Sequence, residues 1–293
     1  MKRSFFLAGS TVALVTPYRD GRVDMDELRK LVDWHLAAGT DVLAPCGCTG
    51  ESATMTHDEH EAVIEAVVRR VRGRRPVMAG TGSNNTIEAV RLTRFAARVG
   101  ADAALVITPY YNKPTQEGLY QHYVHVARSA DIPIVVYNVP GRTAVNVTPE
   151  TLARLSRCRN IVAVKEASGS LDQVSAILQE TDLEVLSGDD SLTLPMLAVG
   201  AAGVISVAAN VVPAETAALV RAGLKGDFAA ARRMHRRLFP LFKALFLETN
   251  PIPVKAALAM MGRIGGDLRL PLTAISAENA KRLRKVLVDL GLV

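Results

Sequence analysis

The chain has 293 residues, of which 49% are hydrophobic and 22% charged, a composition typical of globular proteins. This length allows one large α/β domain or two smaller domains. No apolar run approaches the roughly 18 residues that a membrane span requires. The first ten residues place basic side chains before an apolar stretch that is too short for a secretion signal and lacks a small-residue cleavage pattern. We therefore expect a cytoplasmic protein that does not enter a membrane.

The formal net charge of +6 raises the question of nucleic-acid binding. The arginines are scattered over helical patterns without interleaved aromatic residues, which make up only 5% of the chain. A solvated basic surface is therefore expected, and no nucleic-acid partner. The three cysteines, Cys46, Cys48 and Cys158, fit neither a disulfide framework nor the spacing of a zinc site. No acidic or histidine cluster in the sequence indicates a catalytic metal.

Eight short apolar runs recur at intervals of about 20–35 residues, and each is typical of a buried strand. Helical periodicity fills the stretches between them, as in residues 26–36, 57–71 and 86–99, which each end near a glycine. Strands that alternate with helices predict a parallel sheet with right-handed crossovers, and eight such units predict a closed (β/α)8 TIM barrel. The expected strands are Thr11–Val15, Val42–Cys46, Pro76–Ala79, Ala103–Ile107, Ile134–Tyr137, Ile161–Lys165, Glu184–Leu186 and Gly203–Val207.

An open, doubly wound sheet is the alternative arrangement of such units. It would normally carry a glycine-rich phosphate loop after its first strand, and here that strand is followed by Thr16-Pro17-Tyr18. The barrel is therefore favoured. The strand pattern stops near Gly226, which predicts a catalytic barrel over residues 1–226 and a C-terminal helical region over residues 227–293. Within that region Asn250-Pro251-Ile252-Pro253 is expected to form a rigid turn between helices.

One strand of the predicted barrel leads directly into a lysine. The apolar run Ile161–Val164 is followed by Lys165, at the end of the strand where a barrel places its chemistry. Burial disfavours the ammonium form of lysine, so this amine could attack a carbonyl carbon near neutral pH. The alternative is a lysine that extends from the strand end to the surface. These residues alone leave both interpretations open.

Other strand ends carry groups that suit a small ketoacid. After the second strand, Gly47–Ser52 forms a turn whose backbone N–H groups could bind a carboxylate, with Thr49 adding a hydroxyl; the glycines alone would also fit an ordinary tight turn. Three of the six tyrosines, Tyr110, Tyr111 and Tyr137, lie at the ends of the fourth and fifth strands and could move protons. Arg142 offers a planar fork for a carboxylate.

Together these motifs resemble the pyruvate-dependent class I aldolases and, within them, the dihydrodipicolinate synthase family. The resemblance covers nearly the whole chain, including Asn250–Lys255 and Leu270-Pro271-Leu272 near its end. The segments that carry it are Gly47-Cys48-Thr49-Gly50-Glu51-Ser52, Tyr110-Tyr111-Asn112, Tyr137-Asn138-Val139-Pro140, Lys165-Glu166 and Ser187-Gly188-Asp189-Asp190.

The resemblance implies a lyase that condenses pyruvate with L-aspartate 4-semialdehyde in lysine (diaminopimelate) biosynthesis. It implies that Lys165 forms an imine with pyruvate, so that no cofactor is needed beyond this covalent bond. Tyr137 would then relay protons beside the imine, Thr49 would hold the pyruvate carboxylate, and Arg142 would hold the carboxylate of the semialdehyde. The resemblance also gives Gly188 and Ile205 as the lining of the pyruvate pocket.

The family pattern further implies a homotetramer built as a dimer of dimers, in which Tyr111 reaches a neighbouring active site and closes the proton relay. One departure concerns that relay, because Cys48 stands where the family has a threonine whose hydroxyl links the two tyrosines. A thiol is a weaker donor and acceptor. We expect a tolerated replacement; reduced turnover or a changed substrate is the alternative.

Two other functions stay open. Sugar-acid aldolases such as sialic acid lyase share the lysine and the tyrosine, but their substrates present hydroxyl groups where Arg142 would stand unpaired. A barrel can also persist as a binding protein after its chemistry is lost.

Members of the family that are inhibited by lysine bind it at a dimer interface, and this chain matches that pocket. Glu88 could pair with the amine of the effector and Asn84 could bind its polar ends, although such residues also occur on ordinary surfaces. The matching residues are Ser52, Ala53, His57, His60, Asn84, Glu88 and Tyr110.

Overall fold

The computed structural model describes residues 6–293. Residues 1–5, on which part of the expectation about the N-terminal segment rested, lie outside the described residues. Within residues 6–293, no helix is long and apolar enough to cross a membrane.

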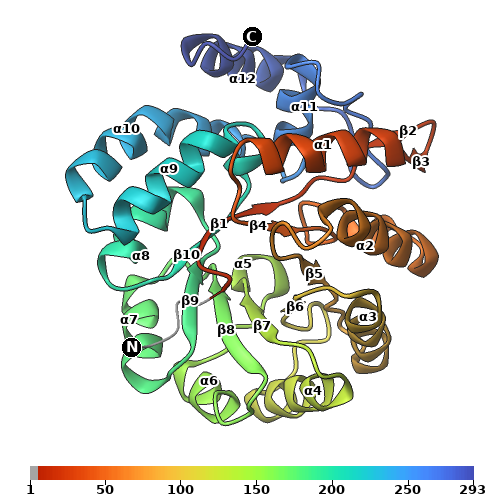
Figure 1. Cartoon of the computed structure of the whole chain (residues 1–293), viewed down its shortest axis with the longest axis vertical. Coiled ribbons are helices and arrows are strands. Elements are labelled where there is room, and N and C mark those ends of the chain that lie inside the picture. The colour runs from red at the N-terminus through yellow and green to blue at the C-terminus, as the bar shows by residue number, and fades with distance from the viewer. Residues whose placement is uncertain (1–5) are drawn as a thin grey trace.

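Eight parallel strands form a barrel at the centre of the molecule (Figure 1). They follow the order β4-β1-β10-β9-β8-β7-β6-β5, and a parallel bridge between Leu43 and Val77 joins the two ends of that order. The predicted TIM barrel is therefore confirmed, and each predicted strand corresponds to an observed one within two residues at either end. The strands are β1 Gly9–Ala13, β4 Val42–Ala44, β5 Met78–Gly80, β6 Ala103–Ile107, β7 Ile134–Asn138, β8 Ile161–Glu166, β9 Glu184–Ser187 and β10 Gly203–Ser206.

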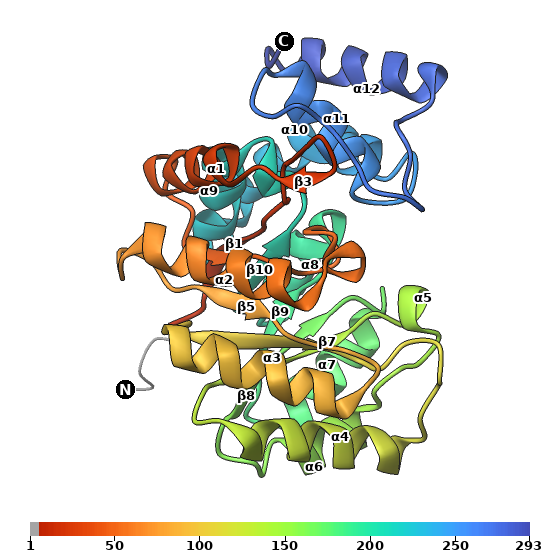
Figure 2. The same cartoon turned by 90° about the vertical axis from the view of Figure 1, so that its right-hand side faces the viewer.

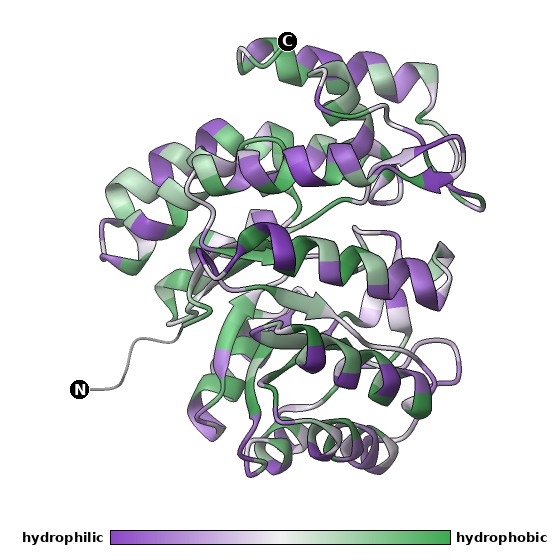
Figure 3. Ribbon diagram, turned by 45° about the vertical axis from the view of Figure 1, so that its right-hand side comes forward, coloured by the Kyte–Doolittle hydropathy of each residue, from purple (hydrophilic) through white to green (hydrophobic). Residues whose placement is uncertain are grey.

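Helices surround the barrel and turn their apolar faces toward it (Figure 3). The capping box of Thr56 and Glu59 starts α2, and Gly100 ends α3 in a left-handed conformation with φ of 88°. The helices around the barrel are α1 Met25–Ala37, α2 His57–Val71, α3 Thr86–Val99, α4 Gln116–Ser129, α5 Pro140–Thr143, α6 Pro149–Leu155, α7 Leu171–Glu180, α8 Thr193–Ala198 and α9 Pro213–Leu224.

Several short elements were not predicted. A two-stranded hairpin, β2 Tyr18–Arg19 with β3 Arg22–Val23, follows the first strand. Strands of two residues leave no alternating pattern from which they could be predicted. Within residues 6–293, three single turns of 3₁₀ helix lie in the connections that follow β4, β9 and β10, at Ser52–Thr54, Asp190–Leu192 and Ala208–Asn210.

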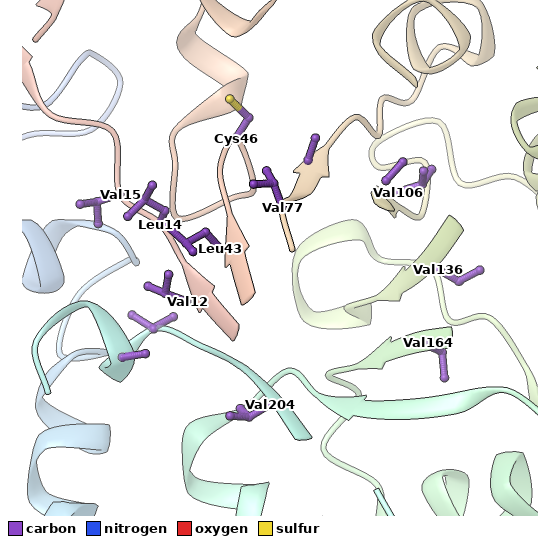
Figure 4. Packing of buried hydrophobic residues seen from close by; sticks show 14 of the residues in the cluster. Val12, Leu14, Val15, Leu43, Cys46, Val77, Val106, Val136, Val164 and Val204 are labelled. Atoms are coloured by element: carbon purple, nitrogen blue, oxygen red, sulfur yellow. The ribbon is translucent and has the colours of Figure 1, made fainter. Parts of the chain in front are cut away.

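Alternation along the strands creates two separate apolar layers. Val136 and Val164 point outward and join the layer between strands and helices, part of which Figure 4 shows. Val135 and Ala163, one residue earlier, point into the barrel. The same alternation directs the side chains two residues further along, at positions 137 and 165, into the barrel at its carboxyl end. The fold thus turns Tyr137 and Lys165 inward.

The C-terminal helices α10 Phe228–Ala244, α11 Ile252–Met260 and α12 Ala277–Asp289 gather on one side of the barrel (Figure 2). Helix α10 packs against α9, and the guanidinium carbon of Arg263 lies 4.4 Å from the ring centroid of Trp34 in α1. The predicted C-terminal helical region is therefore present, as these three helices. The division of the chain at residue 226 stays a prediction.

Candidate functional site

Lys165 and Tyr137 are neighbours inside the barrel. They pair in register between β7 and β8, and the Nζ atom of Lys165 lies 4.0 Å from the ring centroid of Tyr137. Lys165 is only 6% exposed, so it is not the surface lysine of the alternative interpretation. Burial lowers the pKa of Lys165 to about 8, although the nearby Cys48, Asp189 and Asp190 partly oppose this. A substantial fraction of neutral amine is therefore present near pH 7–8 and can attack a carbonyl.

Tyr137 stays protonated throughout the physiological range. Its burial raises the pKa well above 10, and the neighbouring Cys48 raises it further, whereas Arg142 acts in the opposite direction. A protonated phenol beside the Lys165 amine can donate a proton to a developing oxyanion and accept one in return. The structure thus places the departure from the family pattern, Cys48, directly beside Tyr137.

The turn after β4 presents free donors. Within the turn the Gly50 N–H donates to the Gly47 carbonyl, and the Glu51 N–H donates to the Cys48 carbonyl. Among the described residues, the N–H groups of Cys48 and Thr49 have no acceptor. The turn runs into the 3₁₀ turn Ser52–Thr54 and reaches helix α2 only at His57. The two free N–H groups therefore belong to the turn itself, and N–H groups in such a turn can bind an anion.

Arg142 belongs to the short helix α5 and faces the same cavity as this turn. Its Nη2 donates to the backbone carbonyl of Asn250 at 3.1 Å. No carboxylate among residues 6–293 forms an ion pair with it. Arg142 is exposed, as a guanidinium without an ion-pair partner usually is. Its remaining N–H groups are available for a ligand carboxylate.

The predicted lining residues Gly188 and Ile205 lie at the carboxyl ends of β9 and β10. Ile205 is fully buried among the side chains inside the barrel. The Gly188 N–H donates to the Glu166 carbonyl at 2.8 Å, and a Cβ at this position would lie 2.5 Å from the Cβ of Ala167. Glycine is therefore required at this position, because a side chain would collide with that of Ala167.

Tyr111 is separated from the groups above. Its side chain is 89% exposed, and its backbone has φ of 73°, a left-handed conformation that costs a non-glycine residue about 1–2 kcal/mol. The Asn112 N–H closes the turn on the Tyr110 carbonyl at 2.9 Å. The Asn84 side chain also donates to that carbonyl, and the Asn112 side chain donates to the Asn84 carbonyl. Asn84 thus holds the Tyr111 turn from both sides.

A cavity of about 540 Å³ extends from Tyr137, Cys48 and Arg142 to the residues predicted to bind lysine. Glu88 accepts a hydrogen bond from Ser83 at 2.8 Å, and His60 is buried with its Nε2 2.7 Å from the Gly80 carbonyl oxygen. Asn84 does not line this cavity. The predicted residues that do are Ser52, Ala53, His57, His60, Glu88 and Tyr110.

Three buried contacts near the site were not predicted. The Asn250 side chain donates to the Thr49 hydroxyl at 2.9 Å. Lys255 forms a fully buried ion pair with Glu51 at 2.6 Å, and its Nζ also donates to the Thr16 carbonyl. A single lysine in the otherwise apolar helix α11 was a usable signal, because a buried lysine is almost always paired. The Asn250 contact joins positions 201 residues apart and left no such signal.

A third contact fixes the strand end that bears Lys165. The buried carboxylate of Glu166 accepts hydrogen bonds from the side-chain amides of Asn138 and Gln173 and from the Ser168 N–H. This network joins β7, β8 and α7 at the residue that follows Lys165 in β8. Such a satisfied network holds the end of β8 in one geometry.

The sequence model of the dihydrodipicolinate synthetase family matches residues 6–290. A 4-hydroxy-tetrahydrodipicolinate synthase of Nitratidesulfovibrio vulgaris is 56% identical over 288 residues, which is 97% of this chain and 99% of that protein. The chain belongs to the dihydrodipicolinate synthetase family. The crystal structure of dihydrodipicolinate synthase from Aquifex aeolicus is 54% identical, with a TM-score of 0.97 over 98% of this chain and 99% of that one. A dihydrodipicolinate synthase from Cyanidioschyzon merolae, solved with lysine bound, is 42% identical with a TM-score of 0.96, over 98% and 99% of the two chains.

Membership of the dihydrodipicolinate synthetase family agrees with the geometry of the site. The family resemblance stated from the sequence is therefore confirmed, and the buried lysine, the tyrosine beside it and the free N–H groups lie at one end of a single barrel.

Proposed function

We propose that this chain is a 4-hydroxy-tetrahydrodipicolinate synthase, a lyase that condenses pyruvate with L-aspartate 4-semialdehyde in lysine biosynthesis. The observation that carries the proposal is the buried amine of Lys165, with a pKa of about 8, beside the ring of Tyr137. Free donors for two substrate carboxylates lie nearby, on the Cys48–Thr49 backbone and on Arg142. The catalytic bond is a covalent imine, and the proposal calls for no other cofactor.

The reaction begins with attack of the neutral Lys165 amine on the keto carbon of pyruvate. Tyr137 donates a proton to the oxygen of the resulting carbinolamine, one water leaves, and the imine forms. The Thr49 hydroxyl and the two free N–H groups bind the pyruvate carboxylate, and Gly188 and Ile205 shape the pocket around it. Tyr137, which has given up its proton, then accepts a methyl proton from the imine, and the enamine forms.

The enamine carbon attacks the aldehyde carbon of the second substrate, whose oxygen takes up a proton and becomes a hydroxyl group. Arg142 holds the carboxylate of this substrate and orients its aldehyde. The amine of the semialdehyde then adds to the imine carbon and displaces the Lys165 amine, which closes the ring and regenerates the enzyme. One water is released overall, and no oxidant or reductant is consumed.

Turnover with pyruvate and L-aspartate 4-semialdehyde, followed by product absorbance, tests the proposal. Robust turnover supports it and also shows that Cys48 is compatible with the proton relay. We expect Arg142→Ala to raise the KM for the semialdehyde about 10-fold or more, because a charge-assisted hydrogen bond is lost. Absence of turnover in folded protein would overturn the proposal and direct the search to other aldehydes.

We further propose that L-lysine inhibits the enzyme by binding at the far end of the cavity, near His57 and Glu88. A related synthase with lysine bound supports this proposal. Lysine should lower the initial rate in a saturable manner, and Glu88→Gln should raise the concentration needed for half inhibition, because the carboxylate pairs with an effector amine. A rate that stays flat across the lysine titration would reject the effector site.

The proposed assembly is a homotetramer, a dimer of dimers, located in the cytoplasm. The exposed and strained Tyr111 supports an assembly in which this side chain enters a neighbouring active site. Sedimentation velocity measures the assembly directly, and a monomer at working concentration would contradict it.

A further inference from the structure

Asn250 connects the C-terminal helical region to the floor of the active site. It lies between α10 and α11, is only 5% exposed, and lines the cavity. Its Nδ2 donates to the Thr49 Oγ1 at 2.9 Å. Its backbone carbonyl accepts from the Arg142 Nη2 at 3.1 Å. One residue therefore contacts both groups to which the proposed function assigns the substrate carboxylates.

The direction of the bond to Thr49 determines what the threonine can do. A hydroxyl has one hydrogen to donate and two lone pairs to accept with. An amide N–H can only donate, so Thr49 accepts from Asn250 and keeps its own hydrogen. No acceptor for that hydrogen is present among the described residues. The Thr49 hydroxyl and the Cys48 and Thr49 N–H groups are thus three unused donors on one turn.

A second feature separates Asn250 from an ordinary structural asparagine. Its Oδ1 is buried and has no hydrogen-bond partner within residues 6–293. A buried acceptor without a partner destabilises the fold, so a side chain selected only for stability would not leave it so. The segment is meanwhile held in place five residues later, where Lys255 pairs with Glu51 at the end of the same turn.

We propose that Asn250 is a positioning residue for the keto acid: its amide fixes the Thr49 hydroxyl as a hydrogen-bond donor toward the pyruvate carboxylate. This inference rests on the proposed function and extends it to the C-terminal region. The side chain acts on the pyruvate half of the site alone. Arg142, on the semialdehyde half, contacts the Asn250 backbone, which a substitution of the side chain leaves in place.

Steady-state kinetics of Asn250→Asp test the inference. Aspartate has almost the same shape as asparagine, but its ionised carboxylate can only accept, so it would take the Thr49 hydrogen and place a negative charge near the pyruvate carboxylate. The KM for pyruvate should rise at least about 10-fold, with kcat and the KM for the semialdehyde each within about threefold of the parent values. Asn250→Ala should raise the KM for pyruvate less, because it removes the donor without adding a charge.

A double-mutant cycle with Thr49→Val distinguishes positioning from a general structural effect. If Asn250 acts through Thr49, Asn250→Asp adds little to the KM for pyruvate once the hydroxyl is gone. Additive effects in the cycle, or equal rises in both KM values, would overturn the inference. If neither Asn250 variant folds, Asn250 serves the fold and the selective role is likewise overturned.

The unsubstituted chain, measured in the same assay, separates this inference from the proposed function. Its turnover tests the proposed function by itself. The ratio of the two KM effects in the variants tests Asn250.

Discussion

The two tyrosines assigned to the proton relay stand in opposite environments. Tyr137 is buried inside the barrel, paired in register with Lys165 and next to its amine. Tyr111 is 89% exposed on a turn whose backbone has φ of 73°. The strands of the barrel place Tyr137 beside Lys165, whereas nothing within residues 6–293 brings Tyr111 to Lys165. The contrast supports the proposal that one chain organises the covalent chemistry and that a neighbouring chain completes the relay.

The positions of Tyr137 and Tyr111 have different physical causes. Tyr137 and Lys165 point inward because strand residues alternate and because two parallel strands fix their register. The turn that holds Tyr111 outward is fixed by hydrogen bonds from Asn84 and Asn112 to the Tyr110 carbonyl, at a cost in backbone energy. A strained residue that is held in place away from the core is expected to have a functional reason. The following predictions test that reason.

The largest expected effect comes from combining two damaged subunits. Tyr111→Phe should lower kcat about 10²–10³-fold, as expected for a lost proton-transfer group, and Lys165→Ala should remove turnover almost completely. In a hybrid of the two variants, the Lys165 of one subunit meets the native Tyr111 of the other, which completes one site. Co-refolded mixtures should therefore recover activity well above either variant alone. A mixture no more active than Tyr111→Phe would place both tyrosines in the same chain.

A smaller effect should follow from loosening the Tyr111 turn. Asn84→Ala removes the donor to the Tyr110 carbonyl, so the strained turn can relax and Tyr111 is less well positioned. We expect kcat to fall about 10-fold with the fold intact. The matched control is Asn279→Ala, which removes an asparagine of α12 that donates to Glu248, between α10 and α11. An unchanged kcat in Asn84→Ala would show that the turn holds its shape without this bond.

For the buried pair of Lys165 and Tyr137, the pH dependence of kcat/KM for pyruvate should follow the ionisation of the Lys165 amine. Only the neutral amine forms the imine, so the value should rise with pH, with a midpoint near the Lys165 pKa of about 8, and then level off. The Asp189 carboxylate raises this pKa by favouring the ammonium form, so Asp189→Asn should move the rise to lower pH. Asp131→Asn, at an exposed ion pair, is the control. A shift to higher pH in Asp189→Asn would contradict the account.

The smallest effect is expected at Cys48. A hydroxyl forms shorter and stronger hydrogen bonds than a thiol, so Cys48→Thr should improve the link between the two tyrosines and raise kcat about two- to threefold. Cys158→Ser, at a cysteine that does not line the cavity, controls for general thiol effects. A large fall in kcat would show that the neighbourhood of Tyr137 has adapted to the thiol.

The barrel and its inner residues could be predicted because they depend on local pattern. Residues close together in the sequence determine the eight apolar runs and the helices between them. They also determine the alternation that turns Lys165 inward. Contacts between distant segments could not be predicted in this way. Asn250 contacts Thr49, and Lys255 pairs with Glu51. Both contacts depend on how the C-terminal helices pack against the barrel. The exposure and strain of Tyr111 depend on three hydrogen bonds that no periodicity reveals.

The most direct test of the central claim is reduction of the native enzyme with borohydride in the presence of pyruvate, followed by peptide mapping. Only an imine is reduced to a stable adduct, so the account predicts one labelled lysine, Lys165, with labelling that saturates as pyruvate increases. Lys255 is an internal control, because it is equally buried but engaged by Glu51. Absence of the adduct, or an adduct on another lysine, would contradict the assignment of Lys165 as the nucleophile.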